Sequence, residues 1–323
     1  MSENSIATPP GTTSTFSAEL RRVPGVAWIL GLLVLVFALA SRDFLSAPNL
    51  LNIGLQSVIL LILALPMTMI IMTEGVDISM GAVLTLASVV LAWVLAHDGS
   101  LPLALAAALV TGLAFGVGNG MLVALLKMPP FVVTLGTMGV AQGLALLATD
   151  GQSIVVSNDS LQAVYAGSFM GIPQTLLIGA VVYALSHWLL YQTRFGTYVF
   201  ALGGNPDALG LAGIRANYYL IAVYAFGGLM AGLAALILTS RMSSGHPTAA
   251  IGMEFDAIAA VVVGGTSFEH GNGWLFGTLL GVLAVGALRN GLNLLTVASS
   301  VQVSCIGLLV IVALLIDGFK GKK

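Results

Sequence analysis

The chain has 323 residues, of which 58% are hydrophobic and only 7% are charged. Soluble domains carry about 25% charged residues, so this chain has too few charges to solvate a globular surface of its length, and its mean hydropathy is +1.03. A membrane protein is the class that remains. The net charge of -2 argues against a nucleic-acid partner, and the single cysteine, Cys305, excludes an intrachain disulfide and a cysteine metal cluster.

Residues 1–24 are predicted to form a disordered cytoplasmic tail. Arg21 and Arg22 precede an apolar run that ends at Ala40 in Ala-Leu-Ala, a pattern that imitates a cleavable signal peptide. A polar stretch rich in Ser, Thr and Pro precedes the two arginines. This stretch favours a retained first span over a signal peptide.

A helix needs about 20 mostly apolar residues to cross the hydrocarbon of a bilayer. On this criterion the sequence predicts an all-α integral membrane protein with about ten transmembrane helices in a single domain, 25–317, followed by a basic cytoplasmic tail, 318–323. The predicted spans are 25–41, 50–72, 79–96, 101–126, 131–149, 172–191, 217–239, 253–267, 273–290 and 300–316. The eighth is the weakest, because its two acidic residues leave a short apolar stretch; it is either a span or a re-entrant half-helix.

The distribution of lysine and arginine predicts the orientation, because cytoplasmic loops of membrane proteins are enriched in both. With the N-terminus inside, eight of the eleven basic residues fall on the cytoplasmic side: Arg21, Arg22, Lys127, Arg194, Arg215, Lys320, Lys322 and Lys323. Arg42, Arg241 and Arg289 fall outside. The bias places both termini in the cytoplasm and the long loop 192–216 with them.

The two halves of the chain share a pattern of residues. Each half carries an acidic residue, then an Asn-Gly pair, then a glycine 16 positions beyond that pair: Asp77, Asn119-Gly120 and Gly136 in the first half, and Asp256, Asn290-Gly291 and Gly307 in the second. The predicted topology puts the first pair inside and the second outside, as an inverted repeat of five plus five helices would. Because the chain has 39 glycines, chance recurrence is the competing explanation.

Glycines also recur at a spacing of four within single predicted helices. The series are Gly112, Gly116 and Gly120, then Gly228 and Gly232, then Gly277 and Gly281. Small residues at this spacing let helix backbones approach closely in a bilayer. We therefore interpret the three series as helix-packing surfaces.

The sequence lacks the motifs of nucleotide binding and of bond chemistry. It has no G-x-x-x-x-G-K-[ST] phosphate loop, no H-E-x-x-H metal motif and no G-x-S-x-G nucleophile turn. We therefore predict no enzyme activity, no metal site and no cofactor on this chain. The energy for any transport must come from an ion gradient or from a partner.

Acidic residues interrupt the apolar pattern in the segment TEGVDISMG, 73–81. Ionisable residues at membrane depth are costly and usually face a cavity or a partner. The segment predicts a break between two helices, at which Asp77 or Ser79 caps the second helix. Contact of Asp77 with a solute is the alternative, and proton coupling through Glu74 is the more specific hypothesis.

A polar stripe lies on the second predicted span. Asn49, Asn52 and Gln56 follow at positions i, i+3 and i+7 and so share one helix face. Their amides offer both donors and acceptors, which suit an uncharged polyol. Packing of the asparagines against neighbouring helices explains the same stripe and is the interpretation that we favour.

Several long segments resemble a known family. The segment 73–81 resembles T-G-G-I-D-L-S-V-G, and the segments 129–154, 194–214 and 227–267 are similar to their counterparts in the membrane subunits of bacterial ABC importers for ribose, xylose, arabinose, galactose and autoinducer-2. The likeness covers nearly the whole chain beyond the N-terminal tail. One departure is Glu74, where the family usually has glycine.

The resemblance implies a multi-pass subunit of the bacterial inner membrane that imports a monosaccharide or similar small polar solute by alternating access. It also implies three partners: a cytoplasmic ABC ATPase that binds ATP and Mg²⁺, a periplasmic solute-binding protein, and a second permease subunit in a homodimer or heterodimer. On the same resemblance, the segment that docks on the ATPase consists of Gly203, Gly204, Asn205, Pro206, Asp207, Ala208, Leu209, Gly213 and Ile214.

The residue types of this coupling segment agree with that role. Asn205 suits a helix N-cap, Pro206 the first turn, and Asp207 the positive end of the helix. A short helix in the longest internal loop is a suitable lever, although a simple surface turn would use the same residues.

Two alternatives stay open, and a third class is not supported. The chain could be a related ABC permease for a nucleoside or a branched-chain amino acid, because the fold is shared. An ion-coupled secondary transporter would need a titrating acidic residue and no ATPase. A membrane-embedded enzyme has no support from the motifs.

Overall fold

The computed structural model describes residues 25–267 and 271–320, with the backbone alone at 206–208 and 313–320. The predicted N-terminal tail and the last three residues of the predicted C-terminal tail lie outside the described residues. The helices of the first half are α2 (Gly25–Ala40), α3 (Ala47–Met72), α4 (Met80–Ala96), α5 (Leu101–Ala124), α6 (Pro130–Thr149), α7 (Asp159–Ala166) and α8 (Gln174–Tyr191). Those that follow are α9 (Arg194–Gly204), α10 (Pro206–Leu211), α11 (Ala216–Met242), α12 (Met253–Val263), α13 (Leu275–Leu294) and α14 (Ser299–Lys320).

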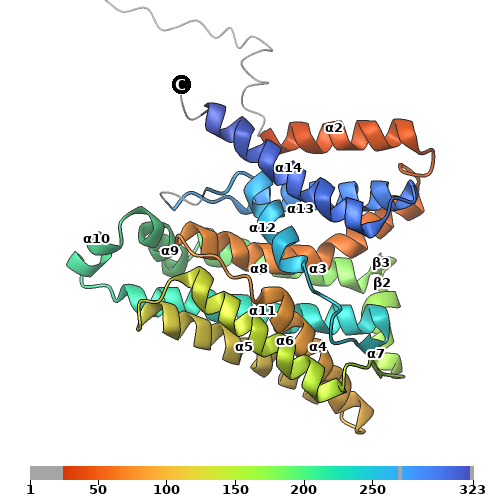
Figure 1. Cartoon of the computed structure of the whole chain (residues 1–323), viewed down its shortest axis with the longest axis horizontal. Coiled ribbons are helices and arrows are strands. Elements are labelled where there is room, and N and C mark those ends of the chain that lie inside the picture. The colour runs from red at the N-terminus through yellow and green to blue at the C-terminus, as the bar shows by residue number, and fades with distance from the viewer. Residues whose placement is uncertain (1–24, 268–270, 321–323) are drawn as a thin grey trace, which may run out of the picture.

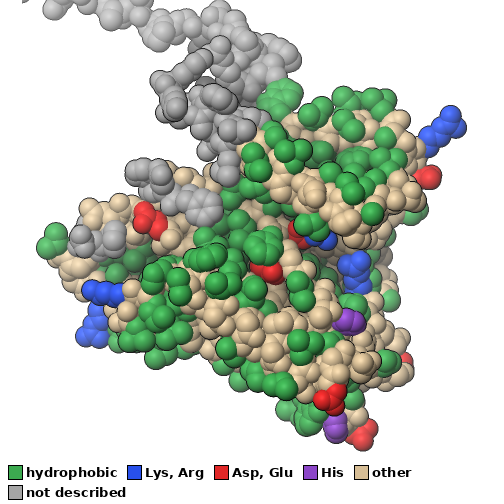
Figure 2. All heavy atoms as spheres, viewed as in Figure 1, with side chains coloured by type: hydrophobic (Ala, Val, Ile, Leu, Met, Phe, Trp, Pro, Cys, Tyr) green, Lys and Arg blue, Asp and Glu red, His purple; other side chains and the backbone are tan. Residues whose placement is uncertain are grey.

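The long helices form a bundle with two distinct ends. Figure 1 shows α9 and α10 at one end, here called the α9 end, and α7 with β2 and β3 at the other, here called the α7 end. Hydrophobic side chains cover much of the flank seen in Figure 2, whereas most charged side chains lie toward the ends of the bundle. This distribution suits a protein whose flank faces lipid.

Six described helices are long and apolar enough to cross a membrane: α3, α5, α6, α8, α11 and α13. The shorter apolar helices are α2, α4 and the part of α14 up to Val312. Helix α12 has 11 residues and is therefore about 16 Å long, roughly half the 30 Å of hydrocarbon in a bilayer. A helix occupies each predicted span, but the count of ten crossings stays a prediction.

Prolines begin three of the long helices. Pro48, Pro102 and Pro130 each lie in a first turn, where a missing backbone N–H costs nothing and the fixed φ angle already suits a helix. This explains why α3 begins three residues before its predicted start. A further proline, Pro66, lies inside α3.

Helix α3 is the centre of the bundle. It contacts α8, α11, α12 and α13, and nearly all of its side chains from Ser57 to Met72 are buried. One buried bond ties it to a neighbour, because the hydroxyls of Thr68 and Thr278 lie 2.7 Å apart. A helix that is apolar on every face is expected in such a central position.

Glycines bring α5 and α11 into backbone contact, as their spacing predicts. A Cβ atom added to Gly112 would overlap the carbonyl oxygen of Gly228, and one added to Gly116 would overlap that of Tyr224. The second pairing follows the same rule, since a Cβ at Gly281 of α13 would overlap the carbonyl oxygen of Ala260 in α12. The interpretation of the glycine series as helix-packing surfaces is confirmed.

In the part of the chain that the structure describes, four short strands lie in the connections. Strand β1 (Ile154–Val155) pairs antiparallel with β4 (Ser244–Gly245) and so joins the segment after α6 to the segment after α11. Strands β2 (Ser168–Phe169) and β3 (Ile172–Pro173) form a hairpin. The two residues between them have positive φ angles, as a two-residue hairpin turn requires.

Gly112→Val should destabilise the bundle, because the added side chain must push apart the backbones of α5 and α11. Overpacking of this kind costs about 1–3 kcal/mol or more. We expect a lower midpoint of thermal unfolding in detergent. Gly118→Ala is the control, since a Cβ there meets open space and alanine favours the helix by up to about 1 kcal/mol. Equal midpoints for the two variants would contradict this packing.

Candidate functional sites in the bundle

The predicted helix break is present between α3 and α4, and Asp77 organises it. Asp77 is 2% exposed. Its Oδ1 atom accepts hydrogen bonds from the backbone N–H of Ser79 at 2.9 Å and from the Ser79 hydroxyl at 2.6 Å. Ser79 is the N-cap residue of α4, but its side chain makes no capping bond to the helix. The carboxylate of Asp77 therefore fixes the entry of α4 through the residue that precedes the helix.

The same group ties the break to α5. The Asn119 amide donates to the Ser79 hydroxyl at 2.9 Å and approaches Oδ2 of Asp77 at 3.5 Å. Asn119 belongs to the first of the two Asn-Gly pairs, and it is 1% exposed. The buried polar cluster thus consists of Asp77, Ser79 and Asn119, and each member supports another.

Glu74 lies on the surface at the end of α3, where its side chain is exposed. Its φ angle is 60°, a value that is strained for residues other than glycine. This positive φ angle explains why the family usually has glycine at this position. Proton coupling through Glu74 gains no support from this exposed position.

The polar stripe of α3 divides into two parts. Asn49 and Asn290 exchange two amide hydrogen bonds of 2.9 Å, so Asn49 joins the start of α3 to α13. The amide of Gln56 donates to Asn52 at 2.8 Å along the same helix. The structure thus brings the first residue of the stripe to the second Asn-Gly pair, and it leaves Asn52 exposed.

The loop 192–216 folds into two short helices. Asn205 ends α9, with its backbone N–H bonded to the carbonyl of Ala201 at 2.8 Å, and α10 begins at the next residue, as predicted. At the far end of α10, Gly213 has a φ angle of 75° and Ile214 donates to the carbonyl of Leu209 at 2.9 Å. These are the features of a glycine-terminated helix. The side chains of residues 206–208 lie outside the described part of the chain.

The two leucines of α10 face in different directions. Leu209 is 5% exposed and Leu211 is 92% exposed. One side of the helix is therefore anchored to the protein while an apolar side chain projects from the other. A single exposed leucine is common on protein surfaces and does not by itself identify a partner.

A junction of three backbones connects this loop to the bundle. A Cβ atom added to Gly203 would overlap the carbonyl oxygen of Met72 and would lie 2.5 Å from the Cα atom of Gly271. Gly203 belongs to α9, Met72 ends α3, and Gly271 follows α12. The inner junction, as we call these three residues, therefore joins α9 to the helix break and to the segment between α12 and α13.

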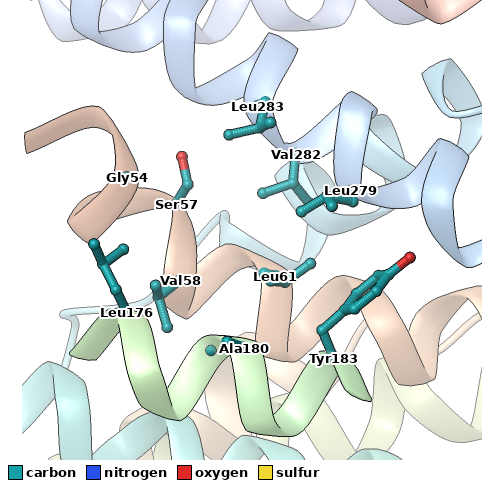
Figure 3. A pocket seen from close by; sticks show the side chains of 11 residues that line it. Gly54, Ser57, Val58, Leu61, Leu176, Ala180, Tyr183, Leu279, Val282 and Leu283 are labelled. Atoms are coloured by element: carbon teal, nitrogen blue, oxygen red, sulfur yellow. The ribbon is translucent and has the colours of Figure 1, made fainter. Parts of the chain in front are cut away.

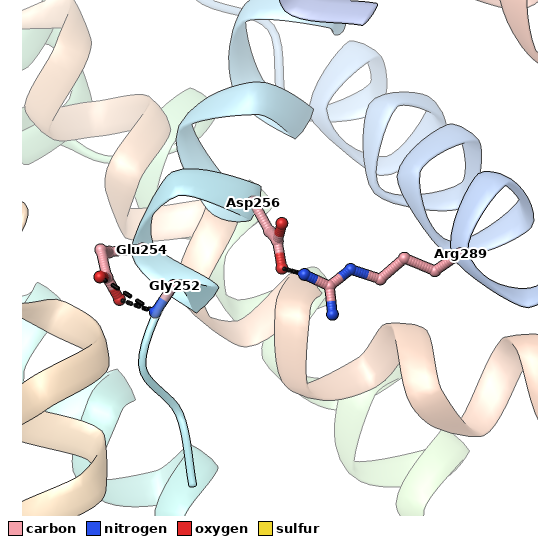
Figure 4. A network of polar contacts seen from close by, with 4 residues as sticks. All are labelled: Gly252, Glu254, Asp256 and Arg289. Atoms are coloured by element: carbon pink, nitrogen blue, oxygen red, sulfur yellow. Dashed lines mark hydrogen bonds and ion pairs between the residues drawn. The ribbon is translucent and has the colours of Figure 1, made fainter. Parts of the chain in front are cut away.

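The last predicted site residue, Asp256, forms an ion pair. Its Oδ2 atom lies 2.5 Å from Nη2 of Arg289 on α13 (Figure 4). Asp256 is 8% exposed at its side chain and Arg289 is 40% exposed. The neighbouring carboxylate of Glu254 is buried and accepts from the backbone N–H of Gly252 at 3.1 Å.

Arg289 is the residue that sequence reasoning missed. The usable signal was its position inside an apolar run, because an ionisable residue in such a run needs a partner. The acidic residue of the same half, Asp256, was the candidate partner, but nothing in the spacing fixes which faces of α12 and α13 meet.

Two of the cavities among the described residues differ in chemistry. One, of about 330 Å³, lies between α3, α8 and α13, and its wall is almost wholly apolar (Figure 3). Its polar groups come from Ser57, whose buried hydroxyl has no hydrogen-bond partner, and Tyr183. The other, of about 400 Å³, is lined by Asp256 and Arg289. A polyol would lose most of its hydrogen bonds in the first cavity.

Glu74→Gly should stabilise the protein, because glycine adopts a positive φ angle without strain. The left-handed conformation costs a residue with a side chain about 1–2 kcal/mol, and the flexibility of glycine in the unfolded chain offsets part of this. We expect a higher midpoint of thermal unfolding in detergent. Glu74→Ala is the control, since it removes the charge but keeps the strain. A midpoint for Glu74→Gly at or below that of Glu74→Ala would show that the strain is absent.

Asp77→Ala should lower the amount of folded protein in the membrane. It leaves the N–H of Ser79 buried without an acceptor, which costs about 1–3 kcal/mol. Fluorescence-detected gel filtration of tagged protein measures the effect, and Asp43→Ala, at an exposed loop position, is the control. Normal abundance combined with impaired solute transport would instead assign Asp77 to the solute path.

Comparison with known proteins agrees with this architecture. Residues 49–314 match the family described as the permease component of a branched-chain amino acid transport system. The chain is 40% identical to the ribose import permease RbsC of Bacillus subtilis, over 94% of this chain and 98% of that protein. It is 38% identical to RbsC of Haemophilus influenzae, over 90% and 92% of the two chains.

A third relative is the D-allose transport system permease AlsC of Escherichia coli, which is 32% identical over 91% of this chain and 90% of that protein. No solved structure matches the chain. The family match covers most of the sequence, including α3 from Asn49 onward, α4 to α13 and all the candidate sites above. The chain therefore belongs to this family of transport-system permease components.

Proposed function

We propose that the chain is the membrane subunit of an ABC importer that moves a ribose-like monosaccharide into the cytoplasm. The observation that carries the proposal is the inner junction, which ties the loop helices α9 and α10 to the centre of the bundle. On this proposal ATP hydrolysis belongs to a separate ATPase subunit, and a periplasmic binding protein delivers the solute. This chain binds no cofactor.

The solute class is supported by the relatives and by the sequence segments that resemble sugar permeases. The relatives above are named for ribose and D-allose import, and they span nearly the whole chain. The family description names branched-chain amino acids, so a permease for such an amino acid or for a nucleoside is the competing reading. A direct uptake assay with labelled sugars and amino acids separates the two.

The orientation that we propose puts the α9 end in the cytoplasm. Lys127 lies beyond the end of α5, and Arg194 and Arg215 flank the loop helices, so these three basic residues gather at that end. Arg42 and Arg241 lie next to the opposite ends of α2 and α11. The positive-inside rule then assigns the α9 end to the cytoplasm, and ten crossings place both termini there.

The contacts between helices support the proposed inverted repeat. Helix α4 packs against α5, α6 and α11, and α12 packs against α13, α14 and α3. The two sets correspond if α4 matches α12, α5 matches α13, α6 matches α14 and α11 matches α3. In each set an acidic residue next to the start of the short helix, Asp77 or Asp256, faces a polar residue at the Asn-Gly pair, Asn119 or Arg289.

The inner junction explains how movement at the loop could open the bundle. Backbone atoms in contact cannot slide independently, so a shift of α9 must move the end of α3 and the segment after α12. Those elements adjoin the helix break and the short helix α12, the least regular parts of the two halves. We propose that docking of the ATPase on α10 shifts this junction and so favours one access state.

The remaining partners follow from the resemblance. We propose that two permease subunits, identical or related, pair in the bacterial inner membrane. Large apolar side chains on α6 and α14 are exposed in the single chain, which is compatible with contact to lipid or to the second subunit.

Gly203→Ala should uncouple ATP hydrolysis from uptake, because the added methyl group must separate α9 from the carbonyl oxygen of Met72. Coupling free energies of about 1–3 kcal/mol correspond to roughly 5–150-fold effects, so we expect uptake by the complete complex to fall about tenfold. ATPase activity of the complex, membrane abundance and sugar uptake are measured together.

Gly204→Ala is the matched control, since the neighbouring glycine has open space at its Cβ position. Wild-type uptake by Gly203→Ala would contradict the proposal that the inner junction transmits movement of α9 to the bundle. If that variant is poorly folded, Leu211→Ser tests the docking step separately, because this exposed side chain supports no folded contact. It should weaken co-purification of the ATPase, and unchanged co-purification would contradict docking at α10.

A further inference from the structure

We infer that the cavity between α12, α13 and α14 is a transit site for a neutral polyol, with Asp256 and Arg289 as its polar ligands. The inference rests on the proposed function for the class of solute, but it adds a binding site within the permease itself. The cavity holds about 400 Å³, and small-molecule pockets are typically about 300–1,000 Å³.

The ion pair gives the site hydrogen-bonding groups without a net charge. A lone charge in this apolar part of the chain would be strongly disfavoured, and the paired carboxylate and guanidinium compensate each other. A carboxylate accepts hydrogen bonds from adjacent hydroxyls and a guanidinium donates several in one plane. The pair therefore suits a solute that has many hydroxyls and no charge.

Part of the hydrogen-bonding capacity of the Asp256–Arg289 pair is unused. The pair joins Oδ2 of Asp256 to Nη2 of Arg289, and among the described residues no hydrogen bond engages Oδ1 of Asp256. The Nε atom of Arg289 is buried and has no hydrogen-bond partner. Buried polar atoms of this kind are rare in native proteins and need an explanation. A solute hydroxyl in the cavity would supply a donor to Oδ1 of Asp256.

The rest of the wall is apolar and includes an aromatic ring. Phe255 lines the cavity and is 57% exposed, and Ile306 and Val310 line it from α14. A sugar ring presents hydroxyls at its edges and C–H groups on its faces. An aromatic or aliphatic wall next to a few convergent polar groups therefore matches both parts of the molecule.

The position of the site suits a solute in transit. Asp256 lies in the first turn of α12, and the start of this helix follows β4, which pairs with β1 after α6. The connection from α12 to α13, which follows the opposite end of α12, meets α9 at Gly271. The site is thus in the half of the bundle away from the loop helices, which is the external half in the proposed orientation.

Cysteine protection tests the site without requiring transport. Gly307 lines the cavity, and a Cβ atom there enters open space, so Gly307→Cys places a thiol in the site. The native Cys305 is first replaced by alanine. Purified Cys305→Ala/Gly307→Cys protein is labelled with a maleimide in the presence of D-ribose, D-allose or L-arabinose, or of betaine, which has no hydroxyl, at equal osmolality.

We expect at least one sugar at about 100 mM to slow labelling threefold or more relative to betaine, because labelling falls with site occupancy. Asp256→Asn and Arg289→Gln should each abolish the protection. Phe255→Ala should weaken it, and this exposed position keeps the test valid if a charge variant is poorly folded. Equal labelling rates in all four solutes, or protection that survives both charge variants, would overturn the site.

The outcome is separable from that of the proposed function. Sugar uptake by the complete complex with its ATPase and binding protein tests the importer directly. Uptake without protection rejects the transit site and leaves the importer standing. Protection without ATP-dependent uptake rejects the importer and leaves a sugar site in a protein of another mechanism.

Discussion

Contact between helix backbones is the interaction on which this bundle depends. Lipid is as apolar as the side chains, so packing must supply the attraction that the hydrophobic effect supplies in water. Glycines meet this demand between α5 and α11, between α12 and α13, and at Gly203 between α3 and the segment after α12. Since these contacts involve backbone atoms, the elements that they join move together. The glycines that make the bundle compact therefore also connect the loop helices to the core.

The polar groups mark the places where the regular bundle is interrupted. Asp77 fixes the start of α4 through the N-cap residue, and Asp256 joins the short helix α12 to α13. Each acidic residue has a partner at or next to one of the two Asn-Gly pairs. On the proposed inverted repeat, the two halves rock against each other around these interruptions, as alternating access requires.

Features set by local chemistry could be predicted from the sequence. The apolar runs predicted where helices lie, Pro206 predicted the start of α10, and the glycine spacing predicted helix faces that pack closely, although not which helices meet. Contacts between distant segments could not be predicted in the same way. Neither the pairing of Asp256 with Arg289 nor the meeting of Gly203 with Gly271 follows from spacing, because each depends on which faces of the elements meet. The strain at Glu74 was hidden for another reason, since a φ angle is set by the turn around it.

The central claim is that this permease is driven through its inner loop by a separate ATPase, and reconstitution tests it most directly. Sugar uptake is measured in liposomes that contain the purified chain with or without the ATPase, with the binding protein outside and ATP inside. The account predicts ATP-dependent accumulation only when the ATPase is present. Accumulation of the sugar against its gradient by the chain alone would contradict it.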